Sequence, residues 1–323
     1  MQVASKRNSR WTREPVTDDG QPVVVHLTER DIEIFKLLTR YRYLPSDYIH
    51  AFVGGGVSAL SRRLNFLSRK PNLYLARPHQ QRESADANYR PLIYELDERG
   101  SRVLKERGLS FLPKRHHRNF AHELMVSQIM ASIELGTRER KHVRLITWSE
   151  ILANPSTPEA TRQSPTATSI PVAFSANGER HAMNINADGQ PFGFQRTIGT
   201  QTTYLFFPGI EADCGTEPVE ASDFERSSIS KKFAAYIAIA EQRIYRSHFG
   251  FPNFFVPFIT TNNVRMDSMM KLLSRMTDGR GSKMFLFKVF PAISSAERSP
   301  KVSGHMLTAP WQRAGFGPFS LTE

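Results

Sequence analysis

An uncharged apolar segment, three carboxylates and a lysine-bearing helix follow one another directly between residues 204 and 236. Residues 204–207, Tyr-Leu-Phe-Phe, predict a strand that is buried on both faces. The carboxylates Glu211, Asp213 and Glu217 come directly after it. Alternation along an extended segment places Glu211 and Asp213 on the same side of the sheet. Any fold of this chain therefore has to bring two like charges together beside a sheet.

Two carboxylates held this close repel each other. Without a cation between them the pKa of one should rise, so the pair is either solvated at the strand end or built for a metal ion or a shared proton. Apolar residues then recur at helical spacing from about Ser227 to Phe249, which predicts a helix packed on the sheet. Lys231 lies nearly opposite the apolar stripe, whereas Lys232 lies at its edge and can reach back toward the strand ends.

The length and composition indicate a globular protein, because 323 residues with 40% hydrophobic content suffice for two domains with separate cores. The apolar runs are far shorter than the ~18 residues that cross a bilayer, and residues 1–7 lack the apolar core of a signal peptide. One cysteine, Cys214, excludes an internal disulfide and a cysteine metal cluster, as is typical of a reducing compartment. We therefore expect a cytoplasmic protein with no membrane partner.

The basic charge of the chain is concentrated in its first third. The net charge is +12, and residues 1–118 carry +9 of it, from 22 basic and 13 acidic residues. Residues 119–323 carry +3, from 21 basic and 18 acidic residues. Such an excess on one module is typical of a protein that binds nucleic acid, with an anionic membrane surface as the weaker alternative.

The N-terminal residues predict a flexible basic arm and then a helix. Residues 1–25 are polar, contain four early basic residues and show no hydrophobic periodicity. Thr28 is a helix-capping residue, and Asp31 stands where a capping box needs an acid. The first helix therefore begins after Thr28 and runs to about Tyr41.

Two further helices are predicted on either side of a glycine turn, at residues 46–52 and 57–69. The second of these turns Leu60, Leu64 and Leu67 inward. Its outer side carries small hydroxyl, amide and guanidinium groups and no acid, as expected of a helix that contacts phosphates and base edges. The candidate DNA contacts are Ser58, Ser61, Arg62, Asn65 and Arg69, with Arg63 nearer the DNA backbone.

A β-hairpin with a long polar tip follows, formed by residues 73–77 and 91–96, and Asp97 caps a last helix that ends near Gly108. Residues 26–112 therefore predict a winged helix-turn-helix, in which the third helix enters the major groove of double-stranded DNA and the wing follows the backbone. A winged helix used for protein docking is the alternative. The wing adds Arg77, Arg82 and Arg90 as candidate contacts.

Residues 113–291 predict an α/β domain with one central sheet and helices on both faces. In such sheets ligands gather at strand ends, where Asp188 of an Asp-Gly turn would join Glu211 and Asp213. Residues 292–323, rich in Ser, Pro and Gly, are predicted to be an irregular tail. The predicted helices are 120–135, 227–249 and 264–276, and the predicted strands are 143–148, 170–174, 183–185, 191–195, 204–207, 254–260 and 284–290.

Segments spread over about residues 26–275 together resemble the replication-relaxation family of plasmid and integrative-element proteins. The most specific one is residues 211–218, Glu-Ala-Asp-Cys-Gly-Thr-Glu-Pro. The resemblance implies DNA binding tied to plasmid replication, relaxation or mobilisation, with a relaxase or replication initiator as a partner. Winged-helix proteins often bind palindromes as dimers, and no heptad seam forces pairing here. The other segments are 28–32, 62–64, 93–97, 99–100, 122–124, 187–189 and 229–232, with Tyr236.

The second domain also resembles the restriction-endonuclease-like core, whose metal site combines two acids with a lysine. Asp188 matches the first acid and Glu211 the second, but Asp213 stands in place of the lysine, and Lys232 could substitute for it. One implication is an endonuclease dependent on Mg²⁺ or Mn²⁺, with Asp188, Glu211 and Asp213 as ligands and Lys232 positioning the water. The alternative is a retained fold that only binds DNA or partners.

Overall fold

The computed structural model describes residues 20–83, 90–109, 119–166, 168–176, 178–220, 228–290 and 302–323. The chain divides into two compact units, which we call the N-terminal and C-terminal units. Most of the predicted arm, residues 1–19, lies outside the described residues. The N-terminal unit holds residues 1–111 and 296–302, and the C-terminal unit holds residues 112–295 and 303–323.

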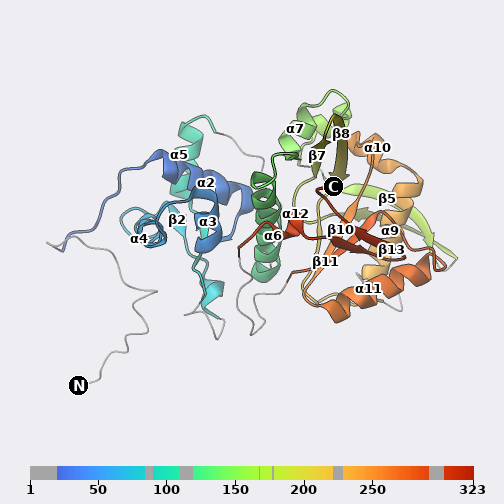
Figure 1. Cartoon of the computed structure of the whole chain (residues 1–323). Helices are drawn as coiled ribbons and strands as arrows, with labels where there is room; N and C mark the ends of the chain where they lie inside the picture. The colour runs from blue at the N-terminus through green and yellow to red at the C-terminus, as the bar shows by residue number, and fades with distance from the viewer. Residues whose placement is uncertain are drawn as a thin grey trace, which may run out of the picture. The chain divides into compact units, whose positions relative to one another are not determined.

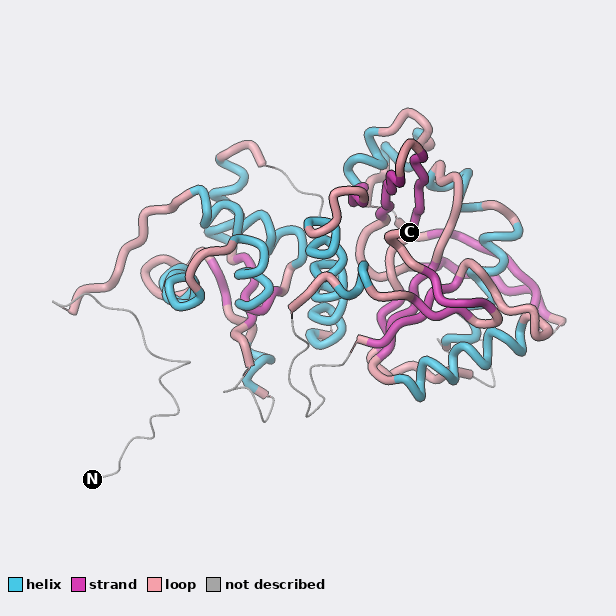
Figure 2. Tube along the Cα trace, viewed as in Figure 1, coloured by secondary structure: helices cyan, strands magenta, loops and turns pink. Residues whose placement is uncertain are grey.

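Among its described residues, the N-terminal unit contains four α-helices (Figures 1 and 2). The first begins with the predicted capping box, since the Thr28 hydroxyl accepts from the Asp31 amide and the Asp31 carboxylate accepts from the Thr28 amide. Leu60, Leu64 and Leu67 are buried as predicted, although their helix ends two residues earlier than expected. The helices are α2 (Glu29–Tyr41), α3 (Ser46–Val53), α4 (Val57–Leu67) and α5 (Glu98–Glu106).

A small antiparallel sheet completes this unit, with the strand order β1-β3-β2. The predicted hairpin is present as β2 and β3, while β1, which the sequence analysis missed, pairs with the other edge of β3. Residues 23–25 of the predicted arm are tied to the unit, because the Asn72 side chain bonds the backbone of Val23 and Val25. The elements are β1 (Leu44–Pro45), β2 (Leu75–Ala76), the 3₁₀-helix η2 (His79–Arg82) and β3 (Ile93–Leu96).

The C-terminal unit is organised on a five-stranded sheet in the order β13-β12-β11-β10-β9. Strands β9, β10 and β11 are parallel, and β12 and β13 extend the sheet antiparallel. The mixed α/β class predicted from the sequence is confirmed. The strands are β9 (Glu211–Asp213), β10 (Val256–Thr260), β11 (Phe285–Val289), β12 (Trp311–Arg313) and β13 (Phe316–Phe319).

Helices cover both faces of this sheet, because successive side chains of β10 and β11 alternate between two cores. Phe258 and Phe285 pack with α9 and α11, whereas Ile259 and Leu286 pack with α6 and α12. Figure 1 shows α11 lying along the sheet. The helices are α6 (Phe120–Arg138), α9 (Ile229–Glu241), α11 (Asn263–Met276) and α12 (His305–Thr308).

The described residues of this unit also form two smaller antiparallel sheets, one with the order β4-β7-β8 and one formed by β5 and β6. The prediction of one central sheet in this domain is therefore wrong. The strands are β4 (Val143–Ile146), β5 (Ile170–Ala176), β6 (Glu179–Ile185), β7 (Phe192–Ile198) and β8 (Gln201–Phe207). The remaining helices are α7 (Trp148–Ala153), α8 (Glu159–Gln163) and α10 (Ile244–Phe249).

Three local predictions are also wrong. The strand at residues 204–207 is not buried on both faces, because Tyr204 is 46% exposed on β8. The helix predicted at 227–249 is interrupted where Arg243 takes a left-handed conformation, which ends α9 and starts α10. The tail is not irregular throughout, since α12, β12 and β13 lie in it. In the described part of the chain, no helix is long and apolar enough to cross a membrane.

Candidate functional site

Glu211 and Asp213 lie on β9, an edge strand of the five-stranded sheet, rather than at the end of β8. The chain leaves β8 through Gly209, whose φ of +142° suits glycine. A Cβ there would lie 2.6 Å from the carbonyl oxygen of Asp188. This close approach lets Asp188 and Ile210 exchange two backbone hydrogen bonds, of 2.7 and 2.9 Å. Asp188 is thereby fixed beside the start of β9.

Glu211 is buried, with 3% of its surface exposed, and two groups of α9 contact its carboxylate. The Tyr236 hydroxyl donates to it over 2.5 Å, and Lys232 Nζ lies 3.0 Å from its other oxygen. Lys232 also lies 2.9 Å from the Glu217 carboxylate. Burial raises the pKa of Glu211, opposed chiefly by Lys232. Burial alone would lower the pKa of Lys232, but Glu211 and Glu217 outweigh it and keep the ammonium charged.

Asp213 is held by a different cation. Arg265 of α11 donates to both carboxylate oxygens of Asp213, over 2.8 Å to Oδ1. The Thr260 hydroxyl donates to Oδ2 over 2.8 Å, and the Gly215 amide donates to Oδ1 over 3.0 Å. The two carboxylates of β9 do point to the same side of the sheet as predicted, but each meets its own cation there. They are neither solvated nor left facing each other.

The Asp188 carboxylate contacts both the backbone of β9 and a histidine of α6. The Ala212 amide donates to Asp188 Oδ2 over 2.8 Å, and His122 Nε2 lies 3.2 Å from the same oxygen. Burial lowers the pKa of the His122 imidazole, but the hydrogen bond and charge of Asp188, with smaller contributions from Glu123 and the Ala212 backbone, outweigh it and raise that pKa. The imidazole is therefore favoured in its charged form beside Asp188.

These groups line one cleft of about 600 Å³ in the C-terminal unit, which we call the carboxylate cleft. Asp188, Glu211, Asp213 and Lys232 all border it, so the structure brings the four predicted cleft residues together. Within the described ranges, no three or more His, Cys, Asp or Glu side chains are arranged to hold a metal ion. Burial, with the charges of Asp213 and Asp188, raises the pKa of the adjoining Cys214 thiol to about 11. The negative charges of Glu211 and Asp213 are paired with the protein's own cations, Lys232 and Arg265.

The predicted DNA contacts lie in the N-terminal unit, on and beside α4. Ser58, Ser61 and Arg62 are exposed, whereas Asn65 is half-buried and lies 3.4 Å from a guanidinium nitrogen of Arg77. The first turn of α4 contains no acidic residue. The exposed face of this helix is therefore uncharged or positive. Of the remaining candidates, Arg82 is exposed, while Arg69, Arg77 and Arg90 are half-buried.

Arg63 lies in a different environment from Arg62. It donates to both carboxylate oxygens of the buried Asp31, over 2.9 and 2.6 Å, and to the His26 carbonyl over 2.6 Å. Asp31 is the same residue that caps α2. Arg63 therefore joins two helices of the unit, and its guanidinium bonds the Asp31 carboxylate and the His26 carbonyl within the fold.

The family model described as replication-relaxation matches residues 35–253, which is more than half of the chain. The chain belongs to the replication-relaxation family. This confirms the resemblance noted in the sequence and places the chain among proteins connected with replication or relaxation of plasmids and mobile elements. No curated protein and no solved structure matches the chain.

Three residues of the cleft network, His122, Tyr236 and Arg265, had no predicted role, and the replication-relaxation match covers the first two of them. His122 and Tyr236 belong to segments that carried the resemblance, and Tyr236 stands one helical turn after Lys232. Arg265 lies beyond residue 253 and was given no role. Nothing local identifies Arg265, because only the parallel pairing of β9 with β10 brings α11 to Asp213.

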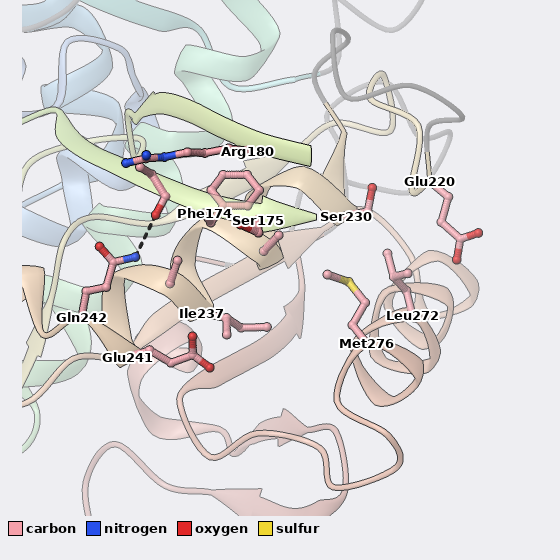
Figure 3. Close-up of a pocket in the computed structure, with 13 residues that line it drawn as sticks. Phe174, Ser175, Arg180, Glu220, Ser230, Ile237, Glu241, Gln242, Leu272 and Met276 are labelled. Carbon is pink, nitrogen blue, oxygen red and sulfur yellow. Dashed lines mark hydrogen bonds between the residues drawn. The ribbon is translucent and has the colours of Figure 1, made fainter. Parts of the chain in front are cut away.

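A second hollow of about 980 Å³ lies in the C-terminal unit of this replication-relaxation protein (Figure 3). Its floor is α9, with Ala234, Ile237 and Ala238, and its walls come from β5 and α11. Phe174 and Leu272 are the buried apolar side chains of these walls. Different sides of α9 thus border the two hollows, and this one holds no cluster of carboxylates.

Proposed function

We propose that this protein is a DNA-binding accessory factor of a plasmid or mobile element, acting in its replication, relaxation or mobilisation. The observation that carries the proposal is the outer face of α4, where Ser58, Ser61 and Arg62 are exposed without an acidic neighbour on the helix. Hydroxyl and guanidinium groups of this kind bind phosphates and base edges. Membership of the replication-relaxation family supports the same role.

The arrangement of the N-terminal unit supports a winged helix-turn-helix. Helix α4 follows α3 across a short glycine turn, and the antiparallel strands β2 and β3 supply the wing. In such a module the helix after the turn enters the major groove and the wing follows the DNA backbone. The net charge of +9 on residues 1–118 favours the same partner, double-stranded DNA. Arg82, exposed beyond β2, is the wing residue best placed for a phosphate.

The test compares two arginines of the N-terminal unit by fluorescence anisotropy on DNA duplexes, with random-sequence DNA and DNA from beside the gene as probes. Arg62→Ala is expected to weaken binding about tenfold and to reduce the slope of log affinity against log salt by about one, the amount for one lost phosphate contact. Arg102→Ala removes the same charge from α5 and is expected to leave both values nearly unchanged. Equal affinity of native protein and Arg62→Ala would exclude α4 as the DNA-contacting helix.

A second candidate function is a metal-dependent DNA endonuclease, favoured by the meeting of Asp188, Glu211 and Lys232 at one cleft. A bound Mg²⁺ or Mn²⁺ ion would activate water for attack on a phosphodiester. Two carboxylates suit Mg²⁺, which commonly retains several waters. In this reading Asp188 and Glu211 hold the ion, Lys232 orients the water, and Asp213 is a structural partner of Arg265 rather than a ligand.

The endonuclease is tested by incubating supercoiled, linear and single-stranded DNA with the protein and Mn²⁺. The expected result is nicking by the native protein and by Asp213→Asn, and none by Asp188→Ala or Glu211→Ala. Mn²⁺ should also raise the melting temperature of the native protein but not of the last two variants. Intact DNA of all three kinds, together with an unchanged melting temperature, would exclude the enzyme while leaving the DNA-binding proposal untouched.

A further inference from the structure

Strands β5 and β6 form a separate two-stranded ribbon in the C-terminal unit. They pair antiparallel over seven residues each, with Ala173 opposite Ala182 and Ser175 opposite Arg180. Every strand of such a ribbon has one edge toward its neighbour and one edge that must be covered, blocked or paired with another strand. The two outer edges of this ribbon differ in how they meet that requirement.

The outer edge of β5 is blocked. Pro171 has no N–H to offer, and the Gln242 side chain donates to the Ala173 carbonyl over 2.8 Å (Figure 3). Because the Ala173 carbonyl points at Gln242, this carbonyl points away from β6. In an antiparallel ladder both backbone groups of a residue point the same way, and the next outward residues are two positions along. The outward groups of β5 are therefore those of Pro171, Ala173 and Ser175.

The outer edge of β6 is open. Its residues opposite Pro171, Ala173 and Ser175 are Asn184, Ala182 and Arg180, and their N–H and C=O groups point away from β5 by the same alternation. All three residues are exposed. No strand among the described residues pairs with this edge. It contains no proline, lysine or bulge, three of the devices that block such an edge, and its charged residues are Glu179 and Arg180.

The geometry points to a second copy of this chain as the partner of that edge, with the two β6 strands paired antiparallel about Ala182. Ala182 then faces its own counterpart, and Arg180 of each copy faces Asn184 of the other. No like charges stand opposite each other, and the smallest side chain lies on the twofold axis. Three N–H and three C=O groups per copy give up to about six hydrogen bonds across the junction.

This pairing stops at two copies. Each ribbon has one open edge, since Pro171 and Gln242 block the other, so the product is a closed four-stranded sheet and not a growing fibre. Asn184 also lines the carboxylate cleft, so the second copy's Arg180 lies at the rim of that cleft. The inference does not depend on DNA binding by the N-terminal unit.

Disulfide trapping tests the register in full-length protein in which Cys214→Ser has removed the native thiol. Ala182→Cys places the two new thiols on directly opposed residues, with Cα atoms about 5.5 Å apart, within the range of a disulfide. Mild oxidation is expected to give mostly covalent dimer. Arg180→Cys is the matched control, because it is equally exposed on the same edge but lies roughly 13 Å from its counterpart. Equal trapping at both positions, or at neither, overturns the pairing.

Light scattering after gel filtration supplies an independent measurement. The native protein at about 100 µM is expected to contain dimer, since an edge-to-edge contact of this size is a small interface. Ala182→Pro removes one N–H at the centre of the junction without touching the ladder to β5 and is expected to be monomeric. Circular dichroism checks that this variant is folded. A native protein that stays monomeric at this concentration, or an Ala182→Pro variant that dimerises as well as native, overturns the proposal.

Discussion

The outer face of α4 and the carboxylate cleft both contain charged side chains, but only those of the cleft are neutralised within the fold. On α4, Arg62 is exposed to solvent, and no acidic residue shares its helix. In the cleft, Lys232 and Arg265 contact Glu211 and Asp213 within the fold. An exposed cation is available to an external anion, whereas a buried ion pair mainly satisfies itself. A charged side chain therefore indicates a candidate binding surface only when it has no partner of opposite charge within the fold.

The largest expected effect comes from removing the cation of the cleft. Lys232→Met leaves Glu211 buried beside Glu217 and Asp188 without its ammonium partner, and should lower the free energy of unfolding by about 3 kcal/mol. Urea unfolding followed by tryptophan fluorescence measures this, since the buried Trp148 and Trp311 report on the C-terminal unit. Lys271→Met, on an exposed position of α11, is the control and should change stability little. Similar losses for both variants would contradict the buried ion pair.

Two adjacent arginines of α4 sharpen the comparison inside one helix. Arg63→Met breaks the ion pair with the buried Asp31 and should cost about 2–3 kcal/mol of stability, because a buried carboxylate loses its partner. Arg62→Met should have almost no effect on stability and a large effect on DNA binding. Far-UV circular dichroism during urea unfolding, with DNA anisotropy beside it, separates the two. A stability loss at Arg62 equal to that at Arg63 would break the distinction.

The hydroxyl of Tyr236 provides a smaller test of the cleft network. Tyr236→Phe removes the donor to the buried Glu211 carboxylate and should cost about 1–2 kcal/mol, as expected for a hydrogen bond to a charged group. Tyr245→Phe is the control, since the Tyr245 ring stacks on Phe254. Its half-buried side chain should tolerate loss of the hydroxyl. Equal urea midpoints for native protein and Tyr236→Phe would show that the hydroxyl contributes nothing.

The smallest effect is a pH dependence from His122. Its pKa in the folded protein lies above the ordinary value of 6.5, so the folded state binds the proton more tightly than the unfolded state. The stabilisation is fully present below pH 6.5 and is lost as the pH rises through the folded pKa. Subtracting the urea stability profile of His122→Gln from that of native protein isolates this contribution, since other titrating groups cancel. A difference that grows with rising pH would contradict the raised pKa.

Local patterns were sufficient to predict most helices and strands of both units. The capping box of Thr28 and Asp31, the leucines of α4 and the alternation in β9 depend on neighbours within a few residues. The reach of Lys232 toward the strand ends follows from the helical period in the same way, and Lys232 contacts Glu211. The family resemblance likewise rested on short segments and was confirmed.

The assignments that failed depend on contacts between distant parts of the chain. The ion pair of Arg63 with Asp31 spans 32 residues and was not predicted, and Arg265, which lies 52 residues from Asp213, was given no role. The tail was predicted irregular because short strands such as β12 gain their hydrogen bonds from β11. Propensity and periodicity are properties of a few neighbouring residues, so the sequence by itself determined which elements form and which face of each is apolar. The order of strands, and hence which charge meets which, is fixed by the long-range packing of those faces, so only the tertiary structure decided which cations are neutralised within the fold and which strand edge is left open.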